Sequence, residues 1–262
     1  MHRLLPLLYP LTSLALLVLI WDLAVRFFSI PDYLLPPPAA VYRALADGFS
    51  DRSLWPHIAT TLGETLTGYA TGSLLAVLLA VLLGVALAES QTFERFVYPL
   101  LIALQATPKV ALGPIILVWF GYGAASKIVL VTLVCFFPLF VNTVNGIRRA
   151  DTDLLDACRA FSASRLYLLF HVKLPSAAGE VFSGLQIGVA LALIGAVVAE
   201  FLSAQRGLGY LIASSSVSMN LSTMFAGVIL LALIGLCGAQ TVRWLQRRVI
   251  FWQPDAVRRR RR

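Results

Sequence analysis

Residues 156–175 read DACRAFSASRLYLLFHVKLP and form the longest moderately polar segment between two apolar stretches of the chain. Apolar residues recur at helical spacing on both sides of a short break at residues 162–164. A serine in this break can cap the second helix, because its side-chain oxygen accepts from a free N–H group of the first turn. Pro175 is expected to end that helix, since proline has no backbone N–H to donate. We therefore predict an amphipathic helical hairpin, suited to a membrane surface or to a cleft in a partner.

The composition around this hairpin is that of a membrane protein. Of the 262 residues, 59% are hydrophobic and 13% are charged, and the mean hydropathy is +0.83. A soluble domain carries about 25% charged residues, and a soluble core of this size could not bury so much apolar surface. We predict an all-α polytopic membrane protein that forms one domain, residues 1–262. Its three cysteines and three histidines are scattered, so neither a disulfide framework nor a metal site is expected.

About six transmembrane helices are predicted, because a bilayer span needs roughly 20 mostly apolar residues. They are expected at residues 8–28, 64–88, 96–119, 126–147, 179–202 and 223–245. A signal peptide is the alternative for the first, but its apolar run is long and no A-x-A cleavage pattern follows it, which favours an uncleaved anchor. The loop that contains the hairpin, residues 150–176, then lies between the fourth and fifth spans.

Lysine and arginine residues set the orientation of these spans. With both termini inside, the cytoplasmic segments carry 15 of the 21 basic residues and the outer segments carry 5, while Lys109 falls within a span. This bias predicts cytoplasmic termini and a cytoplasmic hairpin, in a multi-pass protein of the plasma membrane. The run Arg258 to Arg262 is better explained by an anchor against anionic lipid than by nucleic-acid binding, so no nucleic-acid partner is expected.

The hairpin resembles the EAA loop of bacterial ABC-importer permeases. The family pattern is Glu-Ala-Ala, three residues, Gly, nine residues, Ile, one residue and Leu-Pro, and this chain has DAC, S, V and LP at the same spacing. Ser162 in place of glycine is the main departure, because glycine enters a left-handed turn more readily than serine does. The resemblance implies that the loop docks into an ATPase subunit and carries its motion into the membrane. The residues that it places at this contact are Asp156, Ala157, Cys158, Ser162, Leu174 and Pro175.

Further segments resemble the nitrate/sulfonate/taurine branch of these bacterial inner-membrane permeases. They are LPPPAAV at residues 35–41, PKVALGP at 108–114, WFGYG at 119–123, SKI at 126–128, and AE at 199–200 with GLG at 207–209. The branch implies a permease homodimer with two ATPase subunits and a solute-binding protein outside the membrane. It implies import of a nitrate-, sulfonate- or taurine-like anion or a related small organic compound. A pyrimidine- or flavin-type vitamin precursor is the alternative substrate.

No G-x-x-x-x-G-K-[ST] phosphate-binding loop occurs in the chain, so it is not expected to be an enzyme or to bind a cofactor itself. ATP and magnesium would be bound by the partner subunit. Polar groups at membrane depth are candidates for a translocation pathway, since a buried charge there costs about 2.5–3.5 kcal/mol. These candidates are Lys109, Trp119, Asn142 and Glu200.

Each pathway candidate also has a structural interpretation. Lys109 could extend to the membrane surface or pair with a carboxylate, and Glu200 could pair with Arg206. Asn142 and Asn145 are expected to bond between helices. Two different classes of protein remain as alternatives: an ATP-independent channel or carrier, which would need no docking loop, and a membrane anchor, which would not explain Lys109.

Overall fold

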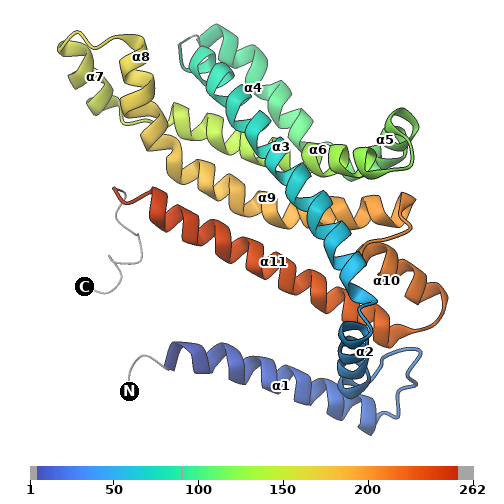
Figure 1. The fold of residues 1–262 in the computed structure, drawn as a ribbon. Coiled ribbons are helices and arrows are strands. Elements are labelled where there is room, and N and C mark those ends of the chain that lie inside the picture. Colours follow the sequence, from blue (N-terminus) through green and yellow to red (C-terminus); the bar gives the residue numbers. More distant parts are fainter. Residues whose placement is uncertain (1–4, 90, 253–262) are drawn as a thin grey trace. The chain divides into compact units, whose positions relative to one another are not determined.

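The computed structural model describes residues 5–89 and 91–252, and these fold into helices with no β-strand among them (Figure 1). The all-α prediction is therefore confirmed. The chain separates into two compact units, Met1–Thr61 with Gln205–Ala232, and Leu62–Ala204 with Leu233–Arg262. Two of the boundaries fall inside long helices and the third falls just after α9, and each unit is described by itself.

The first unit is built around a short helix between the first two apolar segments. It contains α1 (Leu5–Phe27), α2 (Pro38–Ser50), the start of α3 (Leu54–Glu89), α10 (Leu208–Val217) and the start of α11 (Leu221–Val249). Pro38 begins α2 at a position where no backbone N–H is needed. The Asp51 carboxylate accepts a 2.8 Å hydrogen bond from the Ser53 N–H, which closes the turn into α3 and lowers the pKa of Asp51.

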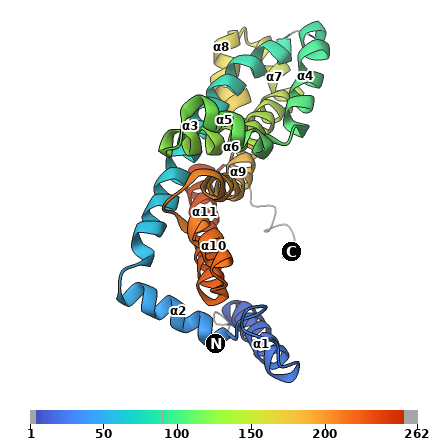
Figure 2. The ribbon, with the colours of Figure 1, turned by 90° about the vertical axis from the view of Figure 1, so that its right-hand side faces the viewer.

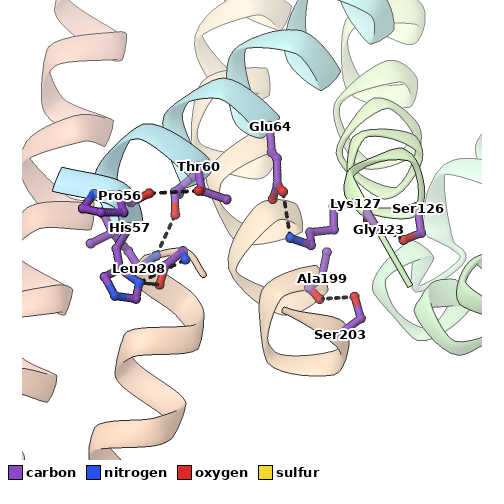
Figure 3. A network of polar contacts seen from close by, with 12 residues as sticks. Pro56, His57, Thr60, Glu64, Gly123, Ser126, Lys127, Ala199, Ser203 and Leu208 are labelled. Atoms are coloured by element: carbon purple, nitrogen blue, oxygen red, sulfur yellow. Dashed lines mark hydrogen bonds and ion pairs between the residues drawn. The ribbon is translucent and has the colours of Figure 1, made fainter. Parts of the chain in front are cut away.

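The N-terminus of α10 is held by two side chains of α3 (Figure 3). Thr61 Oγ1 accepts from the Leu208 N–H at 2.7 Å, and His57 Nδ1 accepts from the Gly207 N–H at 3.1 Å. These contacts satisfy amide groups that a helix start leaves without intrahelical partners.

The second unit has α6 and α9 at its centre, lying side by side (Figures 1 and 2). Its elements are the rest of α3, α4 (Gln91–Ala106), the 3-10 turn η1 (Lys109–Leu112), α5 (Gly113–Phe120), α6 (Ala124–Arg148), α7 (Thr152–Ala160), α8 (Arg165–Leu168), the π-helical turn η2 (Leu169–Lys173), α9 (Leu174–Ser203) and the rest of α11. A Cβ atom at Gly184 would lie 2.8 Å from a methyl group of Leu139, and one at Gly195 would lie 3.3 Å from the Val131 Cα. Small residues thus let the two helices approach closely.

Four helices in the described part of the chain are long and apolar enough to cross a membrane. They are Leu54–Gly84, Ala124–Arg148, Arg165–Ser203 and Leu221–Val249, and the bent pair Arg95–Ala106 with Lys109–Phe120 adds a fifth. The predicted span 8–28 corresponds to α1, of which several side chains lie outside the described part. The helix of the second predicted span begins ten residues earlier than expected, at Leu54 rather than at Glu64.

The third predicted span, 96–119, is not one straight helix. It breaks after Ala106, and the following pieces are turned by 75°. Pro108 lacks a backbone N–H and disfavours helical geometry at the residue before it, which explains the position of the break. Pro114 lies in the first turn of α5, where a proline is tolerated. The prolines thus break this span, and the consequence is a change of direction.

Pro175 does not end the second helix of the hairpin, and that prediction was wrong. Helical structure continues for 39 residues from Arg165 to Ser203 (Figure 1). The π-helical turn η2 ends at Lys173, two residues before Pro175. Its wider hydrogen-bond spacing changes the register just where the proline N–H is missing, so that α9 can begin with the proline in its first turn.

Candidate functional site

The hairpin of residues 150–176 is a small folded unit with both of its helices capped. Asp151 precedes α7, and its Oδ1 accepts from the N–H groups of Asp153 at 2.9 Å and Leu154 at 3.3 Å. Ser164 precedes α8, and its Oγ accepts from the Tyr167 N–H at 3.2 Å. The predicted serine cap is thereby confirmed.

The turn between the two helices depends on the backbone of Ser162, which has a φ of 59°. The Ser162 N–H donates to the Arg159 carbonyl at 2.8 Å, and the Ala163 N–H donates to the Cys158 carbonyl at 3.1 Å. This pair of bonds is the Schellman arrangement, which normally has glycine at the left-handed position. Ser162 therefore adopts the conformation expected of the glycine that it replaces, at a cost of roughly 1 kcal/mol.

The hairpin also has its own apolar core. Ala150, Leu155, Leu168 and Val172 are buried together, with Cys158 packed against them. Other apolar side chains face away from this core. They are Leu154, Phe161, Leu166, Tyr167 and Phe170, with exposed fractions of 48%, 88%, 68%, 49% and 58%. The apolar residues predicted to share one stripe on each helix are thus divided between an internal core and an outer surface.

The six predicted docking residues lie in two places on this hairpin. Asp156, Ala157 and Ser162 are exposed on α7 and in the turn, whereas Cys158 is half-buried. Asp156 forms an ion pair with Arg159 at 2.8 Å. Leu174 and Pro175 lie at the junction with α9 and are half-buried. In Figure 1, α7 and α8 extend beyond the ends of α6 and α9, which leaves their outer surface accessible.

Lys109 caps the broken end of α4. Its Nζ donates to the carbonyls of Gln105 at 2.6 Å and Thr107 at 3.2 Å, and it lies 4.7 Å from the centroid of the Phe137 ring. A cation is favourable there because the carbonyl end of a helix carries partial negative charge. Backbone carbonyls and an aromatic ring therefore surround Lys109 in place of the carboxylate that one interpretation expected.

The other pathway candidates have different surroundings. Trp119 on α5 is 75% exposed, and Glu200 on α9 is 1% exposed. Asn142 donates from Nδ2 to the Pro138 carbonyl of its own helix at 2.7 Å, so its expected interhelical bond is wrong. Asn145 does bond between helices, because its Oδ1 accepts from the Tyr98 hydroxyl at 3.2 Å. A pathway shared by Lys109, Trp119, Asn142 and Glu200 stays a prediction.

A buried ion pair between α3 and α6 was missed by the sequence analysis. Lys127 Nζ lies 2.7 Å from Glu64 Oε1, and each side chain is 8% exposed (Figure 3). Lys127 is one of the five basic residues counted in the outer segments, at the start of the fourth predicted span, and Glu64 is the first residue of the second predicted span. The sequence did contain a signal for this pair, because an acidic and a basic residue lie at the starts of two predicted spans. The early start of α3 at Leu54 puts Glu64 inside the helix, where it can reach Lys127.

Polar side chains also join α9 to two neighbouring helices. The Tyr69 hydroxyl of α3 donates to the Leu185 carbonyl at 2.9 Å, and Gln186 Nε2 donates to Gln246 Oε1 of α11 at 2.6 Å. Beyond the end of α11, the Trp252 Nε1–H donates to the Pro175 carbonyl at 3.3 Å. None of these contacts follows from sequence spacing, since the partners are far apart in the chain.

Comparison with known proteins gives a consistent result. Residues 76–251 match the family described as "Binding-protein-dependent transport system inner membrane component". A probable ABC transporter permease protein of Haemophilus influenzae is 37% identical over 94% of this chain and 98% of its own length. The riboflavin transport system permease protein RibX of Chloroflexus aurantiacus is 37% identical over 93% of this chain and 89% of its own. The taurine transport system permease protein TauC of Escherichia coli is 31% identical over the same shares.

A solved structure supports the fold. The MetNI methionine ABC transporter in inward-facing conformations contains a chain that superposes with a TM-score of 0.52. The match covers 72% of this chain and 93% of that one, at 22% identity. The likeness shows that the two chains have a similar arrangement of helices.

Proposed function

The chain belongs to the family of binding-protein-dependent transport-system inner-membrane components, and we propose that its hairpin of residues 150–176 is the surface on which the ATPase subunit docks. A member of this family is a membrane permease subunit of an ABC importer, which works with an ATPase and a solute-binding protein. The chain accordingly supplies the membrane path, and the ATPase supplies the energy. ATP and magnesium are bound by that partner.

The observation that carries this proposal is a prefolded hairpin with an exposed apolar surface. Its own core and two helix caps hold it together without a partner. Phe161 is nonetheless 88% exposed, and Leu166 is 68% exposed. Apolar side chains held outward by a separate core are a feature of protein contact sites. A groove of the ATPase that covers Asp156 and Ala157 would also cover Phe161, which follows Ala157 by one helical turn.

The hairpin is well placed to transmit motion. It continues without a break into α9, because helical structure runs from Arg165 to Ser203. In the assembly that we propose, two copies of this permease carry two ATPase subunits. Closure of the ATPases on ATP draws the two hairpins together, and each hairpin moves its α9. The helices then open the solute path outward, toward the binding protein.

The orientation that we propose places both termini and the hairpin in the cytoplasm. The charge bias of the loops supports it, and the burial of Lys127 with Glu64 strengthens it by removing one basic residue from the outer segments. The solute-binding protein then meets the segments on the outer side. In the first unit, the segments proposed to lie outside line a cavity of about 410 Å³. Arg43, Asp47 and His57 are among its lining residues.

For the solute, we propose a small sulfonate- or taurine-like anion, as the resemblance of the motifs outside the hairpin to that branch suggests. A heterocyclic vitamin precursor is the second candidate, because the chain is 37% identical to RibX and 31% identical to TauC. The discriminating measurement is calorimetric titration of the associated solute-binding protein with taurine, an aliphatic sulfonate, a pyrimidine and riboflavin. Binding of riboflavin or the pyrimidine alone would replace the first candidate by the second.

The docking proposal predicts that Ala157→Glu releases or uncouples the ATPase. Ala157 is small and exposed, so a partner can approach the backbone of α7 closely there. A larger side chain overpacks such a contact by about 1–3 kcal/mol, and a buried unpaired charge adds to this. We expect at least about tenfold less ATPase to co-purify with the permease, corresponding to 1.4 kcal/mol.

The matched control is Ala46→Glu, which introduces the same side chain at an exposed position of α2, in the first unit rather than in the hairpin. Both variants should reach the membrane in normal amounts. If Ala157→Glu retains the ATPase as well as the control does, the hairpin is not the docking surface. Uptake by vesicles that contain the permease without any ATPase would instead indicate a channel or carrier.

A further inference from the structure

A continuous line of contacts joins α9 to α11 in the second unit. Gln186 hydrogen bonds to Gln246 at 2.6 Å, and the Trp252 indole donates to the Pro175 carbonyl at 3.3 Å. Farther along, a Cβ atom at Gly238 would lie 2.9 Å from Val189, and one at Gly235 would lie 3.0 Å from Leu193. Residue numbers rise along α9 while those of their partners fall along α11, so the two helices are antiparallel neighbours.

This contact face can be seen in the spacing of its residues. Gln186, Val189 and Leu193 are separated by three and four positions on α9, and Gly235, Gly238 and Gln246 by three and eight positions on α11. Such positions share one side of a helix. The polar members lie toward the end where α9 receives the hairpin, and the glycine contacts lie farther from it.

The end of this line coincides with the junction between hairpin and span. Pro175 is in the first turn of α9, directly after the π-helical turn η2, and its carbonyl is the acceptor for Trp252. Ile250, between α11 and Trp252, is 8% exposed and packs the start of this segment, whereas Trp252 itself is 45% exposed. The chain after α11 is therefore attached at the point through which motion of the hairpin must pass.

We propose that Gln186, Gln246 and Trp252 are positioning residues that carry motion of the hairpin from α9 into α11. This inference rests on the proposed docking of an ATPase on the hairpin. α9 receives the motion through the chain itself, because Arg165–Ser203 is continuous helix. Between α9 and α11 the chain passes through α10, at the opposite end of both helices from the hairpin. At the hairpin end, α11 can follow α9 only through side-chain contacts.

The chemistry of these contacts suits that role. Two neutral amides can hydrogen bond in an apolar setting without the desolvation cost of charges. Both glutamines are half-buried, which limits the access of water that could replace either partner. The indole donor of Trp252 adds a second point of attachment near the hairpin. Two separated attachments oblige α11 to rotate and translate with α9, whereas one would leave it free to pivot.

The test follows α9 and α11 separately in the complex of permease and ATPase purified from its own host and placed in lipid nanodiscs. In a background without native cysteines, an environment-sensitive fluorophore is attached to Ser183→Cys on α9 or to Arg243→Cys on α11. Both positions are exposed and lie one turn from the amide pair. The trigger is ATP with vanadate, which needs no knowledge of the solute.

We expect both reporters to respond in the parent protein. In the double variant Gln186→Met, Gln246→Met, the α11 response should fall at least about fivefold, the lower end of typical coupling between sites, while the α9 response persists. Trp252→Phe, which keeps the aromatic ring but removes the donor, should reduce the α11 response in the same direction. It also serves as the milder variant if the double variant folds poorly.

The matched controls are Tyr69→Phe and Trp244→Phe. The first removes a hydrogen bond from α3 to α9 at the residue next to Gln186, and the second alters an exposed tryptophan of α11. Both should leave the α11 response intact. A full α11 response in the double variant overturns the inference, as does silence of both reporters in a parent that retains its ATPase. Failure of the parent to retain the ATPase overturns the docking proposal itself, and the inference with it.

Discussion

At the scale of single residues, Ser162 shows how a turn can keep its geometry when its usual residue is replaced. Its φ of 59° is unfavourable for a residue with a Cβ atom, yet both bonds of the Schellman arrangement are formed. The packed core of the hairpin and the cap at Ser164 supply the stabilisation that offsets this strain. The position therefore specifies a conformation, and the residue that occupies it sets the energetic cost.

Ser162→Gly should stabilise the hairpin by about 1 kcal/mol, because glycine adopts positive φ without steric cost. Ser162→Val should destabilise it, since a β-branched residue is a genuine outlier there. The measurement is hydrogen exchange of the amides of residues 158–163 in the purified permease. Slower exchange is expected for the glycine variant and faster exchange for the valine variant. Equal exchange in all three proteins would show that the turn is not under strain.

At the scale of elements, the long helices are continuous or broken according to how each proline is accommodated. Pro175 lies inside continuous helical structure because a π-helical turn precedes it, whereas Pro108 ends α4 and turns the chain by 75°. The broken end of α4 is then capped by Lys109. Polar contacts join neighbouring helices at separate points, and among them is the buried ion pair between Glu64 and Lys127.

Replacing one residue of this ion pair should destabilise the protein far more than replacing both. Lys127→Met leaves the Glu64 carboxylate buried without its partner, which costs about 3–5 kcal/mol. The double variant Glu64→Gln, Lys127→Met retains a neutral amide and should recover most of that loss. Thermal unfolding of the four proteins in detergent completes the double-mutant cycle. Additive losses from the two single changes would mean that the two groups do not stabilise each other.

At the scale of the whole molecule, the distribution of charge favours an arrangement with polar segments on two sides of a membrane. In the orientation that we propose, the arginine-rich hairpin lies on the cytoplasmic side and the segment between α1 and α3 lies on the outer side. The helices between them are apolar over most of their exposed surface, as is expected where lipid or a second permease covers them. The proposed coupling from hairpin to α9 and α11 depends on this arrangement.

Cysteine labelling tests that topology directly. The background lacks Cys135, Cys158 and Cys237. Ser50→Cys, at the exposed end of α2, should react with an impermeant thiol reagent added outside intact cells. Ser164→Cys, between α7 and α8, should react only after the membrane is opened. The opposite pattern would contradict the orientation and the docking of a cytoplasmic ATPase together.

The sequence by itself determined the class of the protein and the place of its hairpin. Long charge-free stretches leave a chain of this composition few alternatives to membrane helices, since only helices and closed barrels satisfy the backbone in lipid. The hairpin was predictable because its signals are local: apolar spacing, a serine cap and a turn position defined by the EAA-like pattern. The close-packing glycines of α9 were predictable for the same reason, because small residues on one face mark a helix contact.

Only the tertiary structure decided which distant residues meet. The ion pair of Glu64 with Lys127, the amide pair of Gln186 with Gln246 and the bond from Trp252 to Pro175 each join residues that are at least 60 positions apart. The tertiary structure also decided whether the helix bends or continues at each proline. The missing proline N–H is compatible with either a bend or a preceding π-helical turn. The physical reason is that spacing and propensity act along the chain, whereas partners are chosen by packing between helices.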